Sequence, residues 1–103
     1  MTIFFADNPE PRIAAFTKEY RTRYNNAAPN YFVTTAYESL ALIEAALRAG
    51  ATDRASLYQE LLKIKEWDGD TGYATYDDDR MVNRAMTIIK VQNGSWVWAP
   101  EAQ

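Results

Sequence analysis

The sequence contains neither cysteine nor histidine. Without cysteine, the chain can form no disulfide, no thiolate nucleophile and no cysteine-based metal site. Without histidine, it lacks the usual general base and the commonest transition-metal ligand. We therefore expect a protein that is not an enzyme and that carries no metal or other cofactor, because only carboxylates and lysines would be left to do the chemistry.

Basic clusters and long apolar runs are also absent. The chain has 11 basic and 14 acidic residues, a net charge of -3 and an isoelectric point near 4.8, so it offers no phosphate-binding surface and we expect no nucleic-acid partner. No stretch approaches the ~20 apolar residues of a membrane span. Residues 1–7 have no basic region and too short an apolar run for a signal peptide.

The length of 103 residues allows one domain at most. With 48% hydrophobic and 24% charged residues, the composition is that of a globular domain with a modest core. A folded chain of this mass has an accessible surface of roughly 5,900 Å². We expect a single domain or a fragment, with a helical part at residues 1–71 and a strand-rich tail at 72–103.

Helical spacing of apolar residues predicts three helices in the first part. The first spans residues 12–24, with Asn8 as the expected N-cap. The second spans residues 32–49 and ends at Gly50, and the third runs from a cap at Thr52 or Asp53 to about residue 65.

The second helix is apolar on two faces. The first stripe comprises Val33, Ala36, Tyr37, Leu40, Ile43 and Leu47. The second apolar face comprises Leu42, Ala45 and Ala46. A helix that is apolar around most of its circumference is usually packed on two sides. We therefore expect this helix to need a further partner, and Leu42 and Ala46 would belong to that interface if they lie on the outer face.

The rest of the chain has the period of strands. We expect the end of a strand at residues 2–6 and strands at 72–77 and 84–92, and Asn93-Gly94 is a strong hairpin signal before a last strand at 95–98. The predicted fold class is α/β, which within this chain takes the form of α+β: three helices followed by a strand-rich tail.

No candidate catalytic or metal site emerges from the residues themselves. The acidic run Asp77–Asp79 lacks the glycine and glutamate spacing of a calcium loop and is better interpreted as a solvated turn. Glu38 and Glu44 lie six residues apart and point to different faces of their helix, so they cannot act as paired carboxylates.

The order of several short motifs resembles a known family. The motifs are Phe16, Tyr20 and Tyr24 in the first helix, Pro29-Asn30-Tyr31, Tyr37-Glu38-Ser39 at the start of the long helix, Ala49-Gly50 with Asp53, Trp67-Asp68-Gly69 with Thr71-Gly72, Tyr76-Asp77, and Val91-Gln92-Asn93-Gly94. Together they resemble the C-terminal third of type I periplasmic substrate-binding proteins of the branched-chain amino acid ABC transporter type. Two departures are Glu38-Ser39, where the family has Asp-Ala, and a turn at 77–80 without its usual glycine.

The resemblance implies a piece of a larger protein that is not an enzyme. Members of this family have two α/β lobes that close around a small solute, are located in the periplasm and deliver the solute to an ABC permease. An amino-acid-like solute is therefore the implied ligand of the intact protein. The resemblance further implies that Thr34, with Tyr31 nearby, contacts the ligand, whereas Tyr37 is expected to pack in the core.

An alternative from another class is a free-standing interaction domain that self-associates and binds no ligand. In either case we expect a homo-oligomer of this chain. Two copies could pack their long helices together or exchange the tail at residues 96–98.

Overall fold

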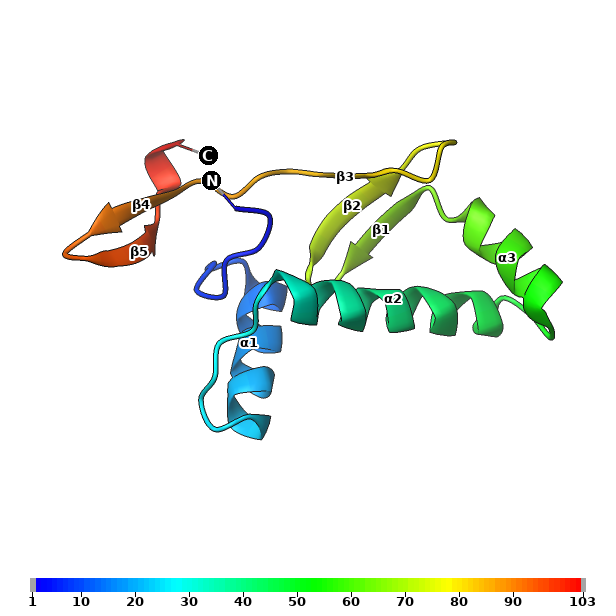
Figure 1. Cartoon of the computed structure of the whole chain (residues 1–103), viewed down its shortest axis with the longest axis horizontal. Coiled ribbons are helices and arrows are strands. Elements are labelled where there is room, and N and C mark those ends of the chain that lie inside the picture. Colours follow the sequence, from blue (N-terminus) through cyan, green and yellow to red (C-terminus); the bar gives the residue numbers. More distant parts are fainter. Residues whose placement is uncertain (1, 103) are drawn as a thin grey trace.

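The computed structural model describes residues 2–102, in which three helices are followed by strands, as the sequence predicts (Figure 1). The elements are α1 (Pro11–Arg23), α2 (Tyr31–Arg48), α3 (Arg54–Lys63), β1 (Glu66–Gly69), β2 (Gly72–Tyr76), β3 (Val82–Arg84), β4 (Ile89–Gln92), β5 (Ser95–Trp98) and the short 3-10 helix η1 (Pro100–Ala102). The α+β prediction is confirmed.

Each helix begins at a capping side chain. Asn30 and Asp53 accept hydrogen bonds from the backbone N–H groups three residues later, which fixes the first residues of α2 and α3. Helix α3 starts after the predicted cap Asp53, and α2 starts one residue before its predicted bound. The first helix differs. Glu10, and not Asn8, is its N-cap and accepts from the N–H of Ile13, while Asn8 Oδ1 accepts from the N–H of Glu10, just before the helix.

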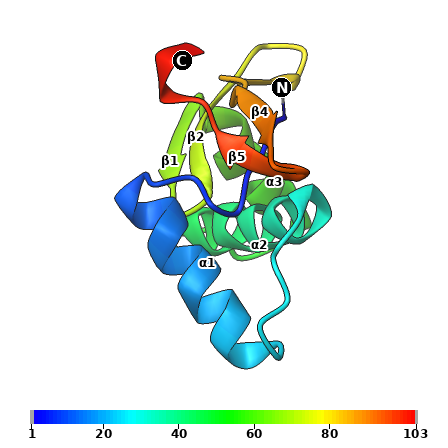
Figure 2. The same ribbon diagram turned by 90° about the vertical axis from the view of Figure 1, so that its left-hand side faces the viewer.

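A three-stranded antiparallel sheet lies against α2 (Figures 1 and 2). Its strand order is β1-β2-β3, with Trp67 opposite Ala74 and Ala74 opposite Arg84. Strand β1 was not predicted, and it begins at Glu66, before the expected boundary at residue 72. Its four residues carry no apolar alternation of their own, and its pairing is set by β2.

The predicted strand over residues 84–92 is wrong, because it is divided between two sheets. Strand β3 ends at Arg84, and β4 starts at Ile89 and forms a separate hairpin with β5 across the predicted Asn93-Gly94 turn. The predicted strand at residues 2–6 is reduced to one bridge, in which Thr2 and Thr87 exchange two backbone hydrogen bonds of 2.8 Å.

Of the two apolar faces of α2, the face with Leu42 and Ala46 is covered, and most of the first stripe is exposed. The face turned toward the sheet and α3 contains Thr34, Glu38 and Ala46, which is 1% exposed, with Leu42 half-buried. Ala36, Leu40, Ile43 and Leu47, here called the outer stripe, are exposed. The placement of Leu42 and Ala46 on an outer face is therefore wrong.

The core is thin for a chain of this length. Its buried hydrophobic residues are Ile13, Ala46, Ala51, Ala74 and Ala99. The accessible surface is 7342 Å², well above the roughly 5,900 Å² of a compact protein of this mass. The radius of gyration of 15.7 Å likewise exceeds the roughly 13 Å of a compact domain. The fold thus leaves apolar surface uncovered.

Candidate functional site

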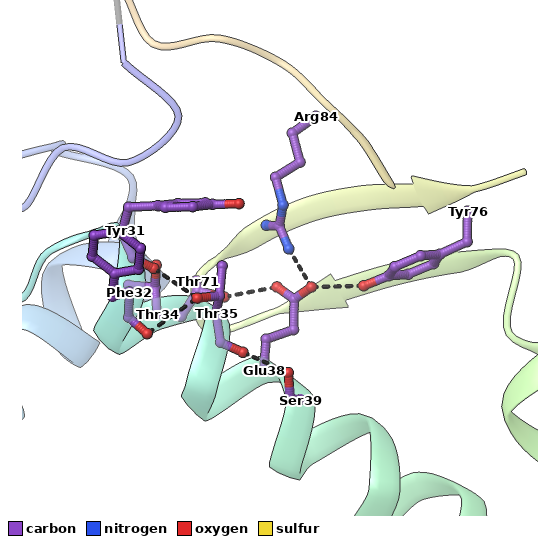
Figure 3. Close-up of polar contacts among 9 residues, drawn as sticks. All are labelled: Tyr31, Phe32, Thr34, Thr35, Glu38, Ser39, Thr71, Tyr76 and Arg84. Carbon is purple, nitrogen blue, oxygen red and sulfur yellow. Dashed lines mark hydrogen bonds and ion pairs between the residues drawn. The ribbon is translucent and has the colours of Figure 1, made fainter. Parts of the chain in front are cut away.

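The first turn of α2 is stabilised by threonine side chains (Figure 3). The Thr34 hydroxyl donates to the Tyr31 carbonyl at 2.9 Å, and the Thr35 hydroxyl lies 3.1 Å from the carbonyls of both Tyr31 and Phe32. Asn30 caps this turn through the N–H of Val33. These bonds fix the backbone at the end of the helix where the resemblance implies ligand contacts.

The two residues expected to contact a ligand differ in exposure. Tyr31, the first residue of α2, is 37% exposed, and its ring packs at a tilt against Phe32 with centroids 5.9 Å apart. Thr34 is only 4% exposed and directs its hydroxyl at the backbone. Of the pair, Tyr31 offers an accessible side chain, and Thr34 supports the turn that carries it.

One turn further along, Glu38 is a buried acid with three partners (Figure 3). Its Oε1 accepts a hydrogen bond from the Tyr76 hydroxyl at 2.6 Å and forms an ion pair with Arg84, and its Oε2 accepts from the Thr71 hydroxyl at 3.1 Å. Both carboxylate oxygens are occupied. Glu38 therefore ties α2 to β2 and β3.

The Tyr76 phenol is a partly buried member of this cluster. Desolvation raises the pKa of the Tyr76 phenol above its ordinary value, and the hydrogen bond and negative charge of Glu38 raise it further. Tyr76 therefore stays neutral and keeps donating to Glu38 at all physiological pH values.

Sequence reasoning did not find this cluster. The available signal was a polar pair, Thr34 and Glu38, four residues apart and hence on one face of an otherwise apolar helix. Nothing in that spacing points to Arg84, which lies 46 residues away.

A second polar contact joins α2 to the turn between β1 and β2. The Tyr37 hydroxyl donates to Asp70 Oδ2 at 2.9 Å, which, with desolvation, raises the pKa of this phenol. The Tyr37 ring meets that of Phe16 edge-on, with centroids 4.9 Å apart, beside an open cavity of about 540 Å³. The expectation that Tyr37 packs in the core is wrong, because it is 43% exposed.

Other features of the described residues carry no site. The acidic run at 77–79 forms the β2–β3 turn, in which Asp77 accepts from the N–H of Met81 at 2.8 Å and Lys65 pairs with Asp78. Among residues 2–102, no three acidic side chains gather as metal ligands would. Within the same range, none of the helices is long and apolar enough to cross a membrane.

Two solved structures resemble this fold over nearly all of its length. A protein described as a branched-chain amino acid ABC transporter from Rhodospirillum rubrum matches 95% of this chain with a TM-score of 0.80 and 27% identity. An ABC transporter substrate-binding protein from Desulfitobacterium hafniense, solved in complex with Leu, matches 94% with a TM-score of 0.77 and 22% identity, a likeness of fold alone. No curated protein matches the chain.

The two solved proteins are much longer than this chain, which spans 29% of the length of each of them. In sequence, the model of the family described as "Periplasmic binding protein" matches residues 1–95. That is nearly the whole chain, and it includes α2 with its capped first turn and the Glu38 cluster. The chain therefore belongs to the periplasmic binding protein family.

Proposed function

We propose that this chain is part of a non-enzymatic, periplasmic solute-binding protein that captures an amino-acid-like solute and delivers it to an ABC permease. The observation that carries the proposal is the family match over residues 1–95, supported by the structural likeness to a branched-chain amino acid ABC transporter protein. The chain would supply part of the ligand cleft.

Within that cleft, Tyr31 is the proposed direct contact. Its exposed ring at the start of α2 supports this role, since aromatic faces pack well on the apolar side chain of an amino acid. Thr34, the other proposed ligand-binding residue, would support Tyr31 indirectly, because its hydroxyl donates a hydrogen bond to the Tyr31 carbonyl.

A chimera tests this function. Residues 2–102 would replace the aligned segment of the Rhodospirillum rubrum protein, and leucine binding would be measured by calorimetry. We expect saturable binding that Tyr31→Ala weakens at least tenfold, with Tyr24→Ala, at an exposed tyrosine on the C-cap of α1, as the matched control. A folded chimera that binds no amino acid would contradict the proposal.

The isolated chain should bind poorly. Part of a cleft offers fewer contacts and no closure, so an affinity in the micromolar range should become millimolar or weaker, a loss of several kcal/mol at ~1.4 kcal/mol per factor of ten. A micromolar dissociation constant for any amino acid would show that the chain holds a complete site.

Self-association is the second candidate function. The exposed outer stripe of α2 favours it, because an apolar helix face of this length is normally covered. In that case the isolated chain would form a homo-oligomer and bind no solute. The chimera would likewise bind no solute through residues of this chain.

A further inference from the structure

The turn between β1 and β2 holds α2 at two consecutive helix residues. Thr71, in this turn, donates a hydrogen bond to Glu38 Oε2 at 3.1 Å, and its neighbour Asp70 accepts one from the Tyr37 hydroxyl at 2.9 Å. Consecutive residues of an α-helix point about 100° apart around the axis, since 3.6 residues make one turn. Two contacts in such different directions, both made by one short turn, fix the rotation of α2 about its own axis.

Glu38 is the buried member of these two anchors. It is 5% exposed, and besides Thr71 its carboxylate meets the Tyr76 hydroxyl at 2.6 Å and the guanidinium of Arg84. These partners come from β2 and β3, so the Glu38 cluster joins the helix to two strands as well as to the turn. Hydrogen bonds and ion pairs depend on direction, whereas hydrophobic contacts do not. The cluster therefore specifies one orientation of the helix.

Tyr31 lies on the face of α2 that Glu38 anchors. The two residues are seven positions apart, which is almost two helical turns, so their side chains leave the helix in nearly the same direction. Figure 3 shows both on the same side of α2. Any rotation of the helix at Glu38 consequently turns Tyr31 by the same angle. Groups in a binding site need to be held to within about 0.5 Å and 10–20° of their working geometry, so even a small rotation would matter.

We propose that Glu38 is a positioning residue of the solute site: the Glu38 cluster sets the rotation of α2 and thereby the direction in which the Tyr31 ring faces the solute. The inference rests on the proposed function, in which Tyr31 contacts an amino-acid-like solute, and assigns part of the binding affinity to a buried cluster two helical turns away. An apolar pair in place of Glu38 and Arg84 could fill the same space but would not favour one rotation over another.

The chimera described above, carrying Glu38→Met and Arg84→Met together, tests the inference. This double variant leaves no unpaired buried charge and should remain folded, which far-UV circular dichroism checks. Leucine binding measured by calorimetry should nevertheless weaken at least tenfold. Adding Tyr31→Ala should then weaken it less than about threefold further, because the ring is already misaligned. Full additivity of the two effects would overturn the inference, since the pair would then act independently of Tyr31.

The matched control is Glu44→Met with Arg48→Met. It makes the same two substitutions on the same helix, at an ion pair of 2.6 Å whose side chains are both more than half exposed, and leucine affinity should change less than about twofold. Tyr76→Phe is a milder second variant, because it removes one hydrogen bond to Glu38 and leaves the ion pair in place. It should weaken leucine binding about threefold.

The rotation of α2 can also be measured without any solute. In the 103-residue chain, residual dipolar couplings of the backbone N–H groups of α2, β1 and β2 report how the helix is turned relative to the sheet. We expect a rotation of at least about 10° in the Glu38→Met and Arg84→Met variant and none in the Glu44→Met and Arg48→Met control.

These couplings separate the inference from the proposed function. If the unmutated chimera binds no leucine, the proposed function fails and the couplings alone decide the inference: a rotated helix supports it. Unchanged couplings in the folded double variant overturn the inference. A folded double-variant chimera that binds leucine as tightly as the unmutated chimera also overturns it and leaves the proposed function intact.

Discussion

Glu38 on α2 and Arg84 at the end of β3 form an ion pair across 46 residues of sequence, and both side chains are largely buried, with 6% and 15% of their surfaces exposed. Removing two charges from water is costly unless they meet each other with good geometry. This pair therefore fixes how the three-stranded sheet sits on α2, and with it the position of the helix end that carries Tyr31.

Breaking this pair on one side should destabilise the chain strongly. Glu38→Met or Arg84→Met alone leaves a buried, unpaired charge, and each should lower the free energy of unfolding by about 3–5 kcal/mol. The double variant should be less destabilised than the sum of the two, with a coupling of about 1–3 kcal/mol. Urea unfolding of the four proteins checks this, and additive effects would show that the two charges act independently.

Because of Tyr76, the free energy of unfolding should decrease at alkaline pH. Its folded-state pKa is raised above the unfolded value near 10, so the folded chain holds this proton more tightly than the unfolded chain does. The stabilisation is fully present below about pH 10 and is lost as the pH rises above it. Melting temperatures between pH 8 and pH 11 should fall more steeply for the natural chain than for Tyr76→Phe.

The control for this experiment is Tyr24→Phe, at an exposed ring on the C-cap of α1. This variant removes one phenol without touching the Glu38 cluster. Tyr37, whose pKa is also raised, should make a contribution of the same sign, so the melting curve of Tyr37→Phe should lie between those of the natural chain and of Tyr76→Phe. Identical curves for the natural chain and Tyr76→Phe would contradict the assignment.

The turn between β2 and β3 holds Arg80 in the left-handed region, with φ at 63°. Asparagine tolerates this conformation, so Arg80→Asn should change the free energy of unfolding by less than about 0.5 kcal/mol. Arg80→Val should cost about 1–2 kcal/mol, because a β-branched side chain clashes there. Chemical denaturation measures both, and Met81→Val, at the next residue, which lacks a positive φ, serves as the control. Equal costs for the valine variants would argue against a strained turn.

Thr34 and Tyr31 should separate stability from binding. Because Thr34 is buried, Thr34→Trp should lower the free energy of unfolding by about 1–3 kcal/mol through overpacking. Tyr31→Ala removes an accessible ring and should reduce stability less, while weakening solute binding in the chimera more. The reverse order, with altered solute selectivity and unchanged melting for Thr34→Trp, would establish Thr34 as the direct contact.

The helices could be predicted well from local patterns. α2 begins one residue before and ends one residue before its predicted bounds, since Asn30 caps its start and Gly50 follows its end. Such signals lie within a few residues of the feature they determine. The Asn93-Gly94 hairpin was found for the same reason, with both residues at positive φ.

The remaining errors arise from contacts that are distant in sequence. Apolar spacing shows that α2 has two apolar faces, but which one is covered depends on the sheet and α3. Glu38 could turn inward because Arg84 and Tyr76, from two different strands, meet it there. The division of residues 84–92 likewise depends on Thr87 pairing with Thr2 at the other end of the chain.

The Thr2–Thr87 bridge also bears on how the chain melts. Within residues 2–102, the β4–β5 hairpin is a two-stranded sheet separate from β1–β3, and residues 85–88, which include Thr87 of the bridge, connect it to β3. Trp96 on β5 is 64% exposed. A two-stranded hairpin is marginal on its own, so its amide protons should exchange with deuterium earlier than those of α2. Trp67 reports on β1, and Trp96 and Trp98 report on the hairpin. Fluorescence of single-tryptophan variants would therefore record two unfolding steps, with detachment of the hairpin first.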